Sequence, residues 1–109
     1  MITIEFDMDK YSVTFKGHAQ SEETDTQGND LVCAAISALF YTLAENLERI
    51  PEFIRKGSLK KTVGKGDASI SCTPIKKYEC NVSQLYLFIY NGMQMFEDAY
   101  PDSVKVLVR

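Results

Sequence analysis

The chain opens with two short runs in which apolar and polar residues alternate. Apolar residues occupy every second position, first at Ile2, Ile4, Phe6 and Met8 and then at Tyr11, Val13 and Phe15. A period of two is typical of strands with one buried face, and the polar pair Asp9–Lys10 between the runs predicts a hairpin. The second strand is expected to end at Gly17–His18.

Two later segments have their apolar residues at helical spacing. The first ends before Pro51, and the second covers about residues 78–99. With successive residues placed about 100° apart, the apolar residues of the first helix fall within about 80°. The apolar stripe of the first helix consists of Val32, Ile36, Leu39, Phe40, Leu43, Leu47 and Ile50. That of the second helix consists of Val82, Leu85, Ile89, Met93 and Phe96. Asn29 or Asp30 is expected to cap the first helix, because such side chains accept hydrogen bonds from its first amides.

Three more strands complete the predicted order. Residues 59–64 and 68–73 read as two strands joined by the turn 65–67, and Pro74 closes the pair. Val104, Val106 and Val108 alternate as a last strand. The order β-β-α-β-β-α-β predicts an α+β fold in which two helices pack on one sheet. A chain of 109 residues makes one domain, expected to cover residues 1–109.

Charge and cysteine content exclude several classes of protein. The net charge of -3 argues against direct binding of nucleic acid, because phosphate contacts require a basic face. No apolar run is expected to be long enough for a membrane span, which needs roughly 18 residues, and no signal peptide is visible at the start. Three cysteines without metal-ligand spacing favour reduced thiols in the cytoplasm. No cofactor or metal is expected.

Between the second strand and the first helix lies a loop without apolar side chains. It covers residues 20–30 and carries Glu22, Glu23, Asp25 and Asp30, with no basic residue. Loops of this length without secondary structure are often functional. We expect this loop, including Gly28, to cover a site and to become ordered when substrate arrives. Its acids should attract a basic partner, although they are also explained as residues that keep a loop soluble.

Cys33 and His18 are the residues most suggestive of chemistry. Cys33 lies near the start of the first helix, where the helix dipole favours a thiolate, and at the edge of the apolar stripe. His18 is the single histidine of the chain and ends a strand that one loop joins to that helix. A nucleophilic cysteine needs a base within hydrogen-bond reach, oriented by a third group. Asp30 is the candidate for that group, and the alternative is that Asp30 only caps the first helix. The alternatives are a small buried hydrophobic residue for Cys33 and a surface histidine for His18.

These residues belong to segments that resemble a known family. Gly17–His18–Ala19, then residues 30–37 (DLVCAAIS), then Asn91–Gly92–Met93 and Tyr100–Pro101 resemble the ribosomal-processing cysteine protease family Prp. The resemblance covers essentially the whole chain. It implies the same strand and helix order, a homodimer and a Cys-His endopeptidase. It also implies a substrate, namely a large-subunit ribosomal protein precursor whose N-terminal extension is removed.

Residue by residue, the resemblance places His18 on the catalytic histidine and Cys33 on the catalytic cysteine. Asp30 and Ser37 also fall on motif positions, and Ser37 either donates a hydrogen bond to His18 or substrate or lets the helix pack closely. The expected reaction is acyl transfer, with amides of the first helical turn, including that of Cys33, holding the oxyanion. Two other functions remain open: a non-catalytic module that binds a ribosomal protein, and a thiol redox sensor.

Overall fold

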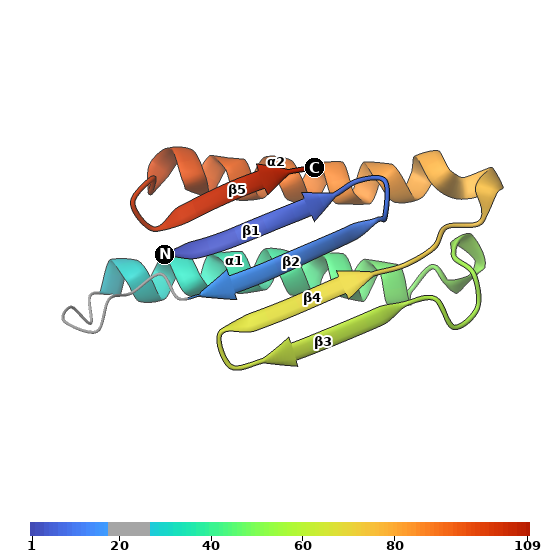
Figure 1. Cartoon of the computed structure of the whole chain (residues 1–109), viewed down its shortest axis with the longest axis horizontal. Coiled ribbons are helices and arrows are strands. Elements are labelled where there is room, and N and C mark those ends of the chain that lie inside the picture. Colours follow the sequence, from blue (N-terminus) through green and yellow to red (C-terminus); the bar gives the residue numbers. More distant parts are fainter. Residues whose placement is uncertain (18–26) are drawn as a thin grey trace.

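The computed structural model describes the backbone of residues 1–17 and 27–109, and the side chains of residues 1–17 and 31–109. Five strands form one sheet in the order β3-β4-β2-β1-β5 (Figure 1). Neighbouring strands are antiparallel, except that β1 and β5 are parallel. The strands are β1 (Ile2–Asp7), β2 (Ser12–Gly17), β3 (Lys60–Gly64), β4 (Asp67–Ser71) and β5 (Val104–Val108).

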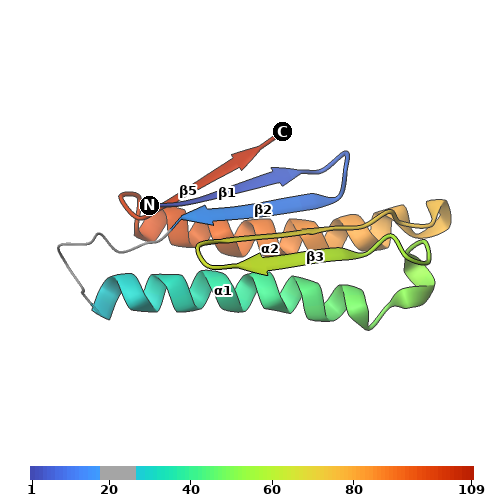
Figure 2. The ribbon, with the colours of Figure 1, turned by 60° about the horizontal axis from the view of Figure 1, so that its bottom comes forward.

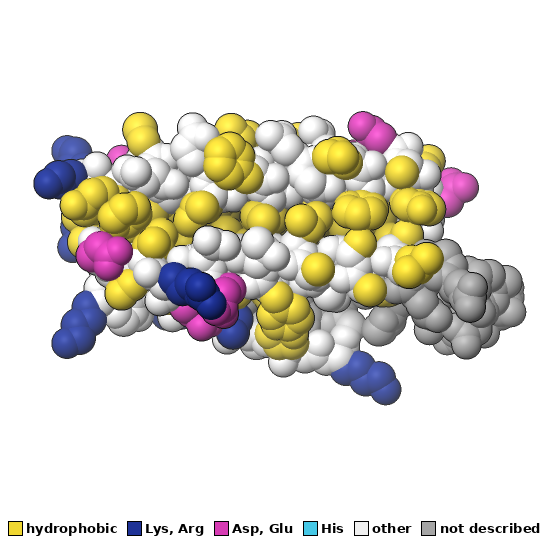
Figure 3. All heavy atoms as spheres, turned by 180° about the vertical axis from the view of Figure 1, so that it is seen from behind, with side chains coloured by type: hydrophobic (Ala, Val, Ile, Leu, Met, Phe, Trp, Pro, Cys, Tyr) yellow, Lys and Arg dark blue, Asp and Glu magenta, His cyan; other side chains and the backbone are white. Residues whose placement is uncertain are grey.

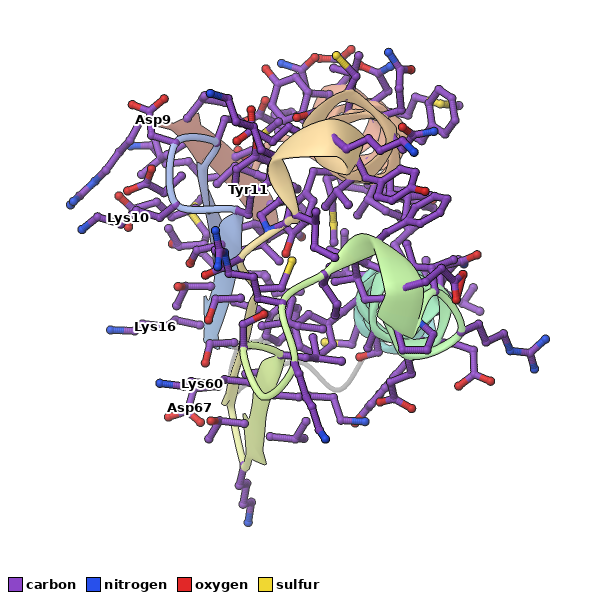
Figure 4. All side chains as sticks on the ribbon, turned by 90° about the vertical axis from the view of Figure 1, so that its right-hand side faces the viewer. Asp9, Lys10, Tyr11, Lys16, Lys60 and Asp67 are labelled. Atoms are coloured by element: carbon purple, nitrogen blue, oxygen red, sulfur yellow. The ribbon has the colours of Figure 1, made fainter. Side chains whose placement is uncertain are left out.

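Two long helices, α1 (Gln27–Glu48) and α2 (Glu79–Ala99), cover one face of this sheet (Figure 2). Two short 3-10 turns, η1 (Pro51–Phe53) and η2 (Lys76–Tyr78), complete the described elements. The other face of the sheet is polar, and Lys16, Lys60 and Asp67 project from it on the side away from the helices (Figure 4). The predicted fold class, α+β with two helices on one sheet, is therefore confirmed.

The start of α1 differs from the sequence prediction. Asn29 and Asp30 were expected at the cap, but the helix begins at Gln27, so both residues lie inside its first turn. Gly28, expected in the loop, is also part of the helix. Acidic and capping residues are favoured both at the cap and in the first turn, because both positions meet the positive end of the helix dipole. Sequence preference therefore does not separate the two positions.

The core lies between the sheet and the helices and is built from the predicted apolar positions. Alternate strand residues Ile2, Ile4, Phe6, Val13, Ile70 and Val104 are buried against helix residues Val32, Ile36, Phe40, Leu43, Leu47, Val82, Ile89 and Met93. Gly92 lets the helices approach, since a Cβ there would lie 3.2 Å from the Leu39 side chain. The segment Leu31–Glu48 is long and apolar enough, by length and composition, to cross a membrane, contrary to expectation. In this fold its apolar stripe packs against the sheet.

Tyr86 is a core residue that the helical pattern of apolar positions did not include. Its side chain is fully buried, and its hydroxyl donates a 2.7 Å hydrogen bond to the carbonyl oxygen of Tyr11. The Cys72 sulfur lies 3.6 Å from the same hydroxyl. Burial raises the pKa of both Cys72 and Tyr86 above their ordinary values, because the charged forms lose solvation. A tyrosine hydroxyl thus ties α2 to the turn between β1 and β2.

We expect the stability of the fold to fall above about pH 9, the region where an unfolded thiol and then an unfolded phenol begin to ionise. Because the folded chain holds both groups neutral, the folded state binds more protons than the unfolded state at alkaline pH. The free energy of unfolding therefore has its full value below the pKa values that the two groups have in the unfolded chain. It decreases as the pH rises through those values. Tyr86→Phe should lower it by about 1 kcal/mol at neutral pH through the lost hydrogen bond, and should flatten the alkaline decrease. Urea unfolding followed by circular dichroism between about pH 7 and about pH 10 measures both effects. An equally steep alkaline decrease in Tyr86→Phe would contradict this account.

Candidate active site

A cavity of about 200 Å³ lies where α1, the end of β2 and the β3–β4 hairpin meet. The helix contributes Cys33, Ser37, Phe40 and Tyr41, and β2 contributes Phe15 and Gly17. The hairpin supplies the remaining wall, from Val63 to Ala68 without Lys65. A thiol, a hydroxyl and an aromatic phenol thus share one small space with the backbone of a tight turn.

Cys33 reaches this cavity from the edge of the apolar stripe. Val32 and Ile36 beside it are buried, whereas Cys33 is half-buried and Ser37 follows it one turn later on the same wall. The position at the edge of the core stripe agrees with the prediction. It lets a thiol sit on a firmly packed helix and still open onto a cavity.

The relation of Cys33 to the start of the helix differs from expectation. Because α1 begins at Gln27, Cys33 lies in its second turn. Only the first four amides of a helix lack a partner within it, so the Cys33 amide belongs to the helical ladder. The Cys33 amide therefore lies outside the first helical turn, whose free amides were expected to hold the oxyanion. The helix dipole also acts most strongly within the first turn, which reduces its share in stabilising a thiolate at Cys33.

Gly17, at the end of β2, is one of the residues that line the cavity. Its φ of +97° lies in the left-handed region, and a Cβ there would collide with the carbonyl oxygen of Met1. Its amide donates a 2.7 Å hydrogen bond to the carbonyl oxygen of Gly66 in the hairpin turn. Only glycine fits this position without strain. Gly17 also immediately precedes His18 in the sequence.

The hairpin Gly64–Lys65–Gly66–Asp67 was predicted as a plain turn between strands, and it is one. The sequence did not predict that this hairpin lies beside Cys33. That place depends on the pairing of β4 with β2, which brings Asp67 opposite Lys16 across more than fifty residues of sequence. The side chain of Asp67 itself projects away from the helices (Figure 4). No local pattern in the sequence reports such a long-range contact.

Two apolar residues at the cavity were also missed. Tyr41 and Val63 are 48% and 50% exposed, and both line the cavity. For Tyr41 a signal did exist, since it follows Cys33 by eight residues and Ser37 by four, which places all three on one side of the helix. No signal in the sequence indicated that Val63 lines the cavity. Exposed apolar side chains beside a thiol offer a surface for an apolar part of a ligand.

The other predicted site residues fall partly outside the described structure. His18, Glu22, Glu23 and Asp25 lie outside the described residues. For Asp30 the backbone is described, in the first turn of α1, but the side chain is not. The structure thus brings together Cys33, Ser37 and the residue before His18, and leaves the remaining predictions untested.

Cys72 and Cys80 take no part in this cavity. Cys72 is buried just after β4, and Cys80 is exposed in the first turn of α2. None of the three cysteines, all of which are described, forms a disulfide. Among the described side chains, those of residues 1–17 and 31–109, no cluster of three His, Cys, Asp or Glu is arranged to hold a metal ion.

Comparison with known proteins gives a family match over nearly the whole chain. The family model described as cysteine protease Prp matches residues 1–105. No curated protein matches the chain.

Solved structures provide the second comparison. An essential ribosomal processing protease Prp from S. aureus, in complex with a covalently linked product peptide, superposes with a TM-score of 0.76 at 18% identity over all of both chains. The same protease with a substrate peptide gives 0.76 at 16% identity, again over both whole chains. SMU.848 from Streptococcus mutans gives 0.68 at 23% identity, over 98% of this chain and 90% of that one. At these identities the likeness shows a shared fold.

Proposed function

Because the chain belongs to the cysteine protease Prp family, we propose that it is a cysteine endopeptidase that removes the N-terminal extension of a large-subunit ribosomal protein precursor. The observation that carries the proposal is the cavity in which the Cys33 wall of α1 faces Gly17, the residue before His18. The S. aureus protease, described with a substrate peptide and a covalently linked product peptide, supports a peptide substrate. Such a reaction belongs in the cytoplasm, where ribosomes are assembled.

In the proposed mechanism Cys33 is the nucleophile and His18 the base. His18 takes the proton of the Cys33 thiol, the thiolate attacks the scissile carbonyl, and the amine leaves with that proton. Water then hydrolyses the thioester and restores the thiol. Ser37, on the same wall as Cys33, donates a hydrogen bond to His18 or to the substrate, and Asp30 orients His18.

The acidic loop before α1 is assigned to substrate attraction and covering. Glu22, Glu23 and Asp25 would attract a basic ribosomal protein, and salt would weaken that attraction by screening. Gly28, at the beginning of α1, would allow the loop to close over bound peptide. Measuring cleavage at rising salt, in the wild type and in a variant with these three acids neutralised, tests this role.

The decisive experiment is incubation of the purified chain with the extended precursor, followed by mass spectrometry of the products. The proposal expects two fragments, of which the smaller is the N-terminal extension. Binding without fragments would indicate a binding module instead. A mass change at Cys33, as sulfenate or disulfide and without peptide cleavage, would indicate a redox sensor.

A homodimer is the second part of the proposal, and the helix layer is the surface assigned to it. No charged residue occurs from Leu31 to Ala44 in α1 or from Cys80 to Phe96 in α2. Within these stretches Leu31, Phe88 and Met95 are 67%, 62% and 70% exposed. Seen from the helix side, hydrophobic side chains follow both helices and charged ones lie toward the margin (Figure 3). Exposed apolar surface of this kind marks an interaction site.

Light scattering is expected to give the mass of two chains for the wild type. Phe88→Glu should shift it to the mass of one chain, because a carboxylate would have to be buried without a partner. Lys105→Glu, a charge change at an exposed residue of β5, serves as the control and should leave the dimer intact. A dimer that persists in Phe88→Glu would reassign the interface to another surface.

A further inference from the structure

The two edge strands of the sheet, β5 and β3, differ in whether their outward backbone amides have hydrogen-bond partners. At the β5 edge, the Val104 amide donates to the carbonyl oxygen of Tyr100 at 3.1 Å. The Val106 amide donates to Oε2 of Glu97, on α2, at 2.8 Å. The last turn of α2 and the residue that follows it thus occupy these two outward amides. Where these two amides are occupied, the β5 edge does not accept another strand.

The backbone of β3 forms the other edge, and its orientation follows from one hydrogen bond. The amide of Gly17 bonds to the carbonyl of Gly66, so Gly66 directs its backbone toward β2. Backbone groups alternate sides along a strand, so Asp67, Ser69 and Ser71 direct theirs toward β3. Their partners across the ladder are Gly64, Thr62 and Lys60.

Lys61 and Val63 therefore direct their N–H and C=O groups away from β4, toward the open edge. All five residues of β3 are exposed. No backbone group of residues 1–17 and 27–109, and no side chain of residues 1–17 and 31–109, takes up the Lys61 and Val63 amides. The β3 edge thus presents two amides and two carbonyls at the spacing of a strand.

The open edge is continuous with the cavity of Cys33. The Val63 side chain is half-exposed and lines that cavity together with Cys33 and Tyr41. Its neighbour Gly64, also at the cavity, has no side chain to obstruct a passing peptide. A residue placed opposite Val63 in an added strand would direct its side chain to the same face as Val63, because paired residues share a face. That face is the one that holds the cavity.

We propose that the peptide substrate binds in extended form as a sixth strand on the β3 edge, with its backbone bonded to Val63 and Lys61 and alternate side chains directed to the cavity. The inference rests on the proposed protease function and specifies how its substrate is recognised. Strand addition recognises a backbone and uses pockets for every second side chain. The substrate class is accordingly an extended segment with an apolar residue opposite Val63 and no proline at the residues that bond the edge.

Amide hydrogen exchange tests the binding mode without relying on catalysis. The probe is a synthetic peptide spanning the extension junction of the ribosomal protein precursor, added at saturating concentration to the Cys33→Ser variant so that it stays uncut. Exchange of the Val63 and Lys61 amides, measured by NMR, should slow by about tenfold or more when the peptide bonds them. Thr62, whose amide already bonds β4, is the internal control and should change little.

Kinetics of a proline variant provide the second measurement. Val63→Pro removes the outward amide, and proline is tolerated at an edge strand whose N–H faces solvent. KM for the same peptide should rise roughly three- to tenfold above that of Val63→Ala, which loses most of the side chain but keeps the amide. Equal KM values in the two variants, both with native circular dichroism, would overturn the proposal.

The outcomes separate the binding mode from the proposed reaction. Unchanged exchange at Val63 with the peptide at saturation overturns the strand addition, and the protease assignment stands if the wild type still cuts the peptide. If the peptide slows exchange of the Val63 amide but the wild type does not cut it, the binding mode is supported and the proposed reaction is contradicted. Protection of Val63 without peptide, increasing with protein concentration, would show that a second copy of this chain occupies the edge and would also overturn the proposal.

Discussion

Replacing Cys33 with alanine is expected to abolish cleavage of the precursor, with a loss of roughly a thousandfold or more in kcat, because removal of a nucleophile eliminates the covalent route. The fold should persist, since Cys33 is only half-buried at the edge of the core and alanine leaves a small gap. Mass spectrometry of the products and far-UV circular dichroism measure the two effects. Cys80→Ala is the matched control, because Cys80 is exposed on α2 and does not line the cavity.

His18→Ala is expected to give a comparable loss, because the thiol would then lack its base. Two observations would separate this role from a structural one. Activity should return in part at higher pH, where more of the Cys33 thiol ionises without help, and precursor binding should remain. Cleavage at the wild-type rate in either Cys33→Ala or His18→Ala would remove the assignment to this pair.

After these two substitutions, Gly17→Ala is expected to be the most damaging, although it removes no chemical group. A side chain at φ of +97° is strained, and its Cβ would meet the carbonyl oxygen of Met1. Gly57 is the matched control, with φ of +79° and no atom within 4 Å of its Cβ position. Gly57→Ala should cost about 1 to 2 kcal/mol of unfolding free energy for the left-handed conformation alone.

Gly17→Ala should cost more than Gly57→Ala, because the backbone at the end of β2 must move as well. That movement would disturb the hydrogen bond to Gly66 and the cavity, so kcat/KM should fall at least tenfold even where the chain remains folded. Urea unfolding and peptide cleavage compare the two variants. Equal unfolding free energies and equal activities would show that the contact with Met1 has no consequence.

Much of the fold followed from the sequence because it depends on local periodicity. The alternating residues of β1, β2 and β5 and the apolar stripes of α1 and α2 marked their elements and most of the core. Boundaries were less accurate: α1 begins two residues before the first expected cap, and β4 ends at Ser71 rather than at residue 73. Strands and helices are terminated by tertiary hydrogen bonds as well as by residue preference.

Part of the candidate site also followed from the sequence. Cys33 and Ser37 were both singled out from the sequence, and the structure places them on one cavity. Tyr86 was not expected in the core, because a tyrosine is buried only where its hydroxyl finds a partner, and that partner, the Tyr11 carbonyl, lies 75 residues away. The role of His18 stays a prediction.

By itself, the sequence determined which residues form helices and strands, which faces of those elements are apolar, and which thiol lies beside the core stripe. Only the tertiary structure decided that the β3–β4 hairpin lies beside Cys33, that Gly17 contacts Met1, and that α2 closes the β5 edge while β3 stays open among the described residues. The first set depends on the spacing of side chains along a helix or strand, which is visible within a few residues. The second depends on backbone groups meeting across the sheet, and a backbone group carries no residue identity that a sequence pattern can register.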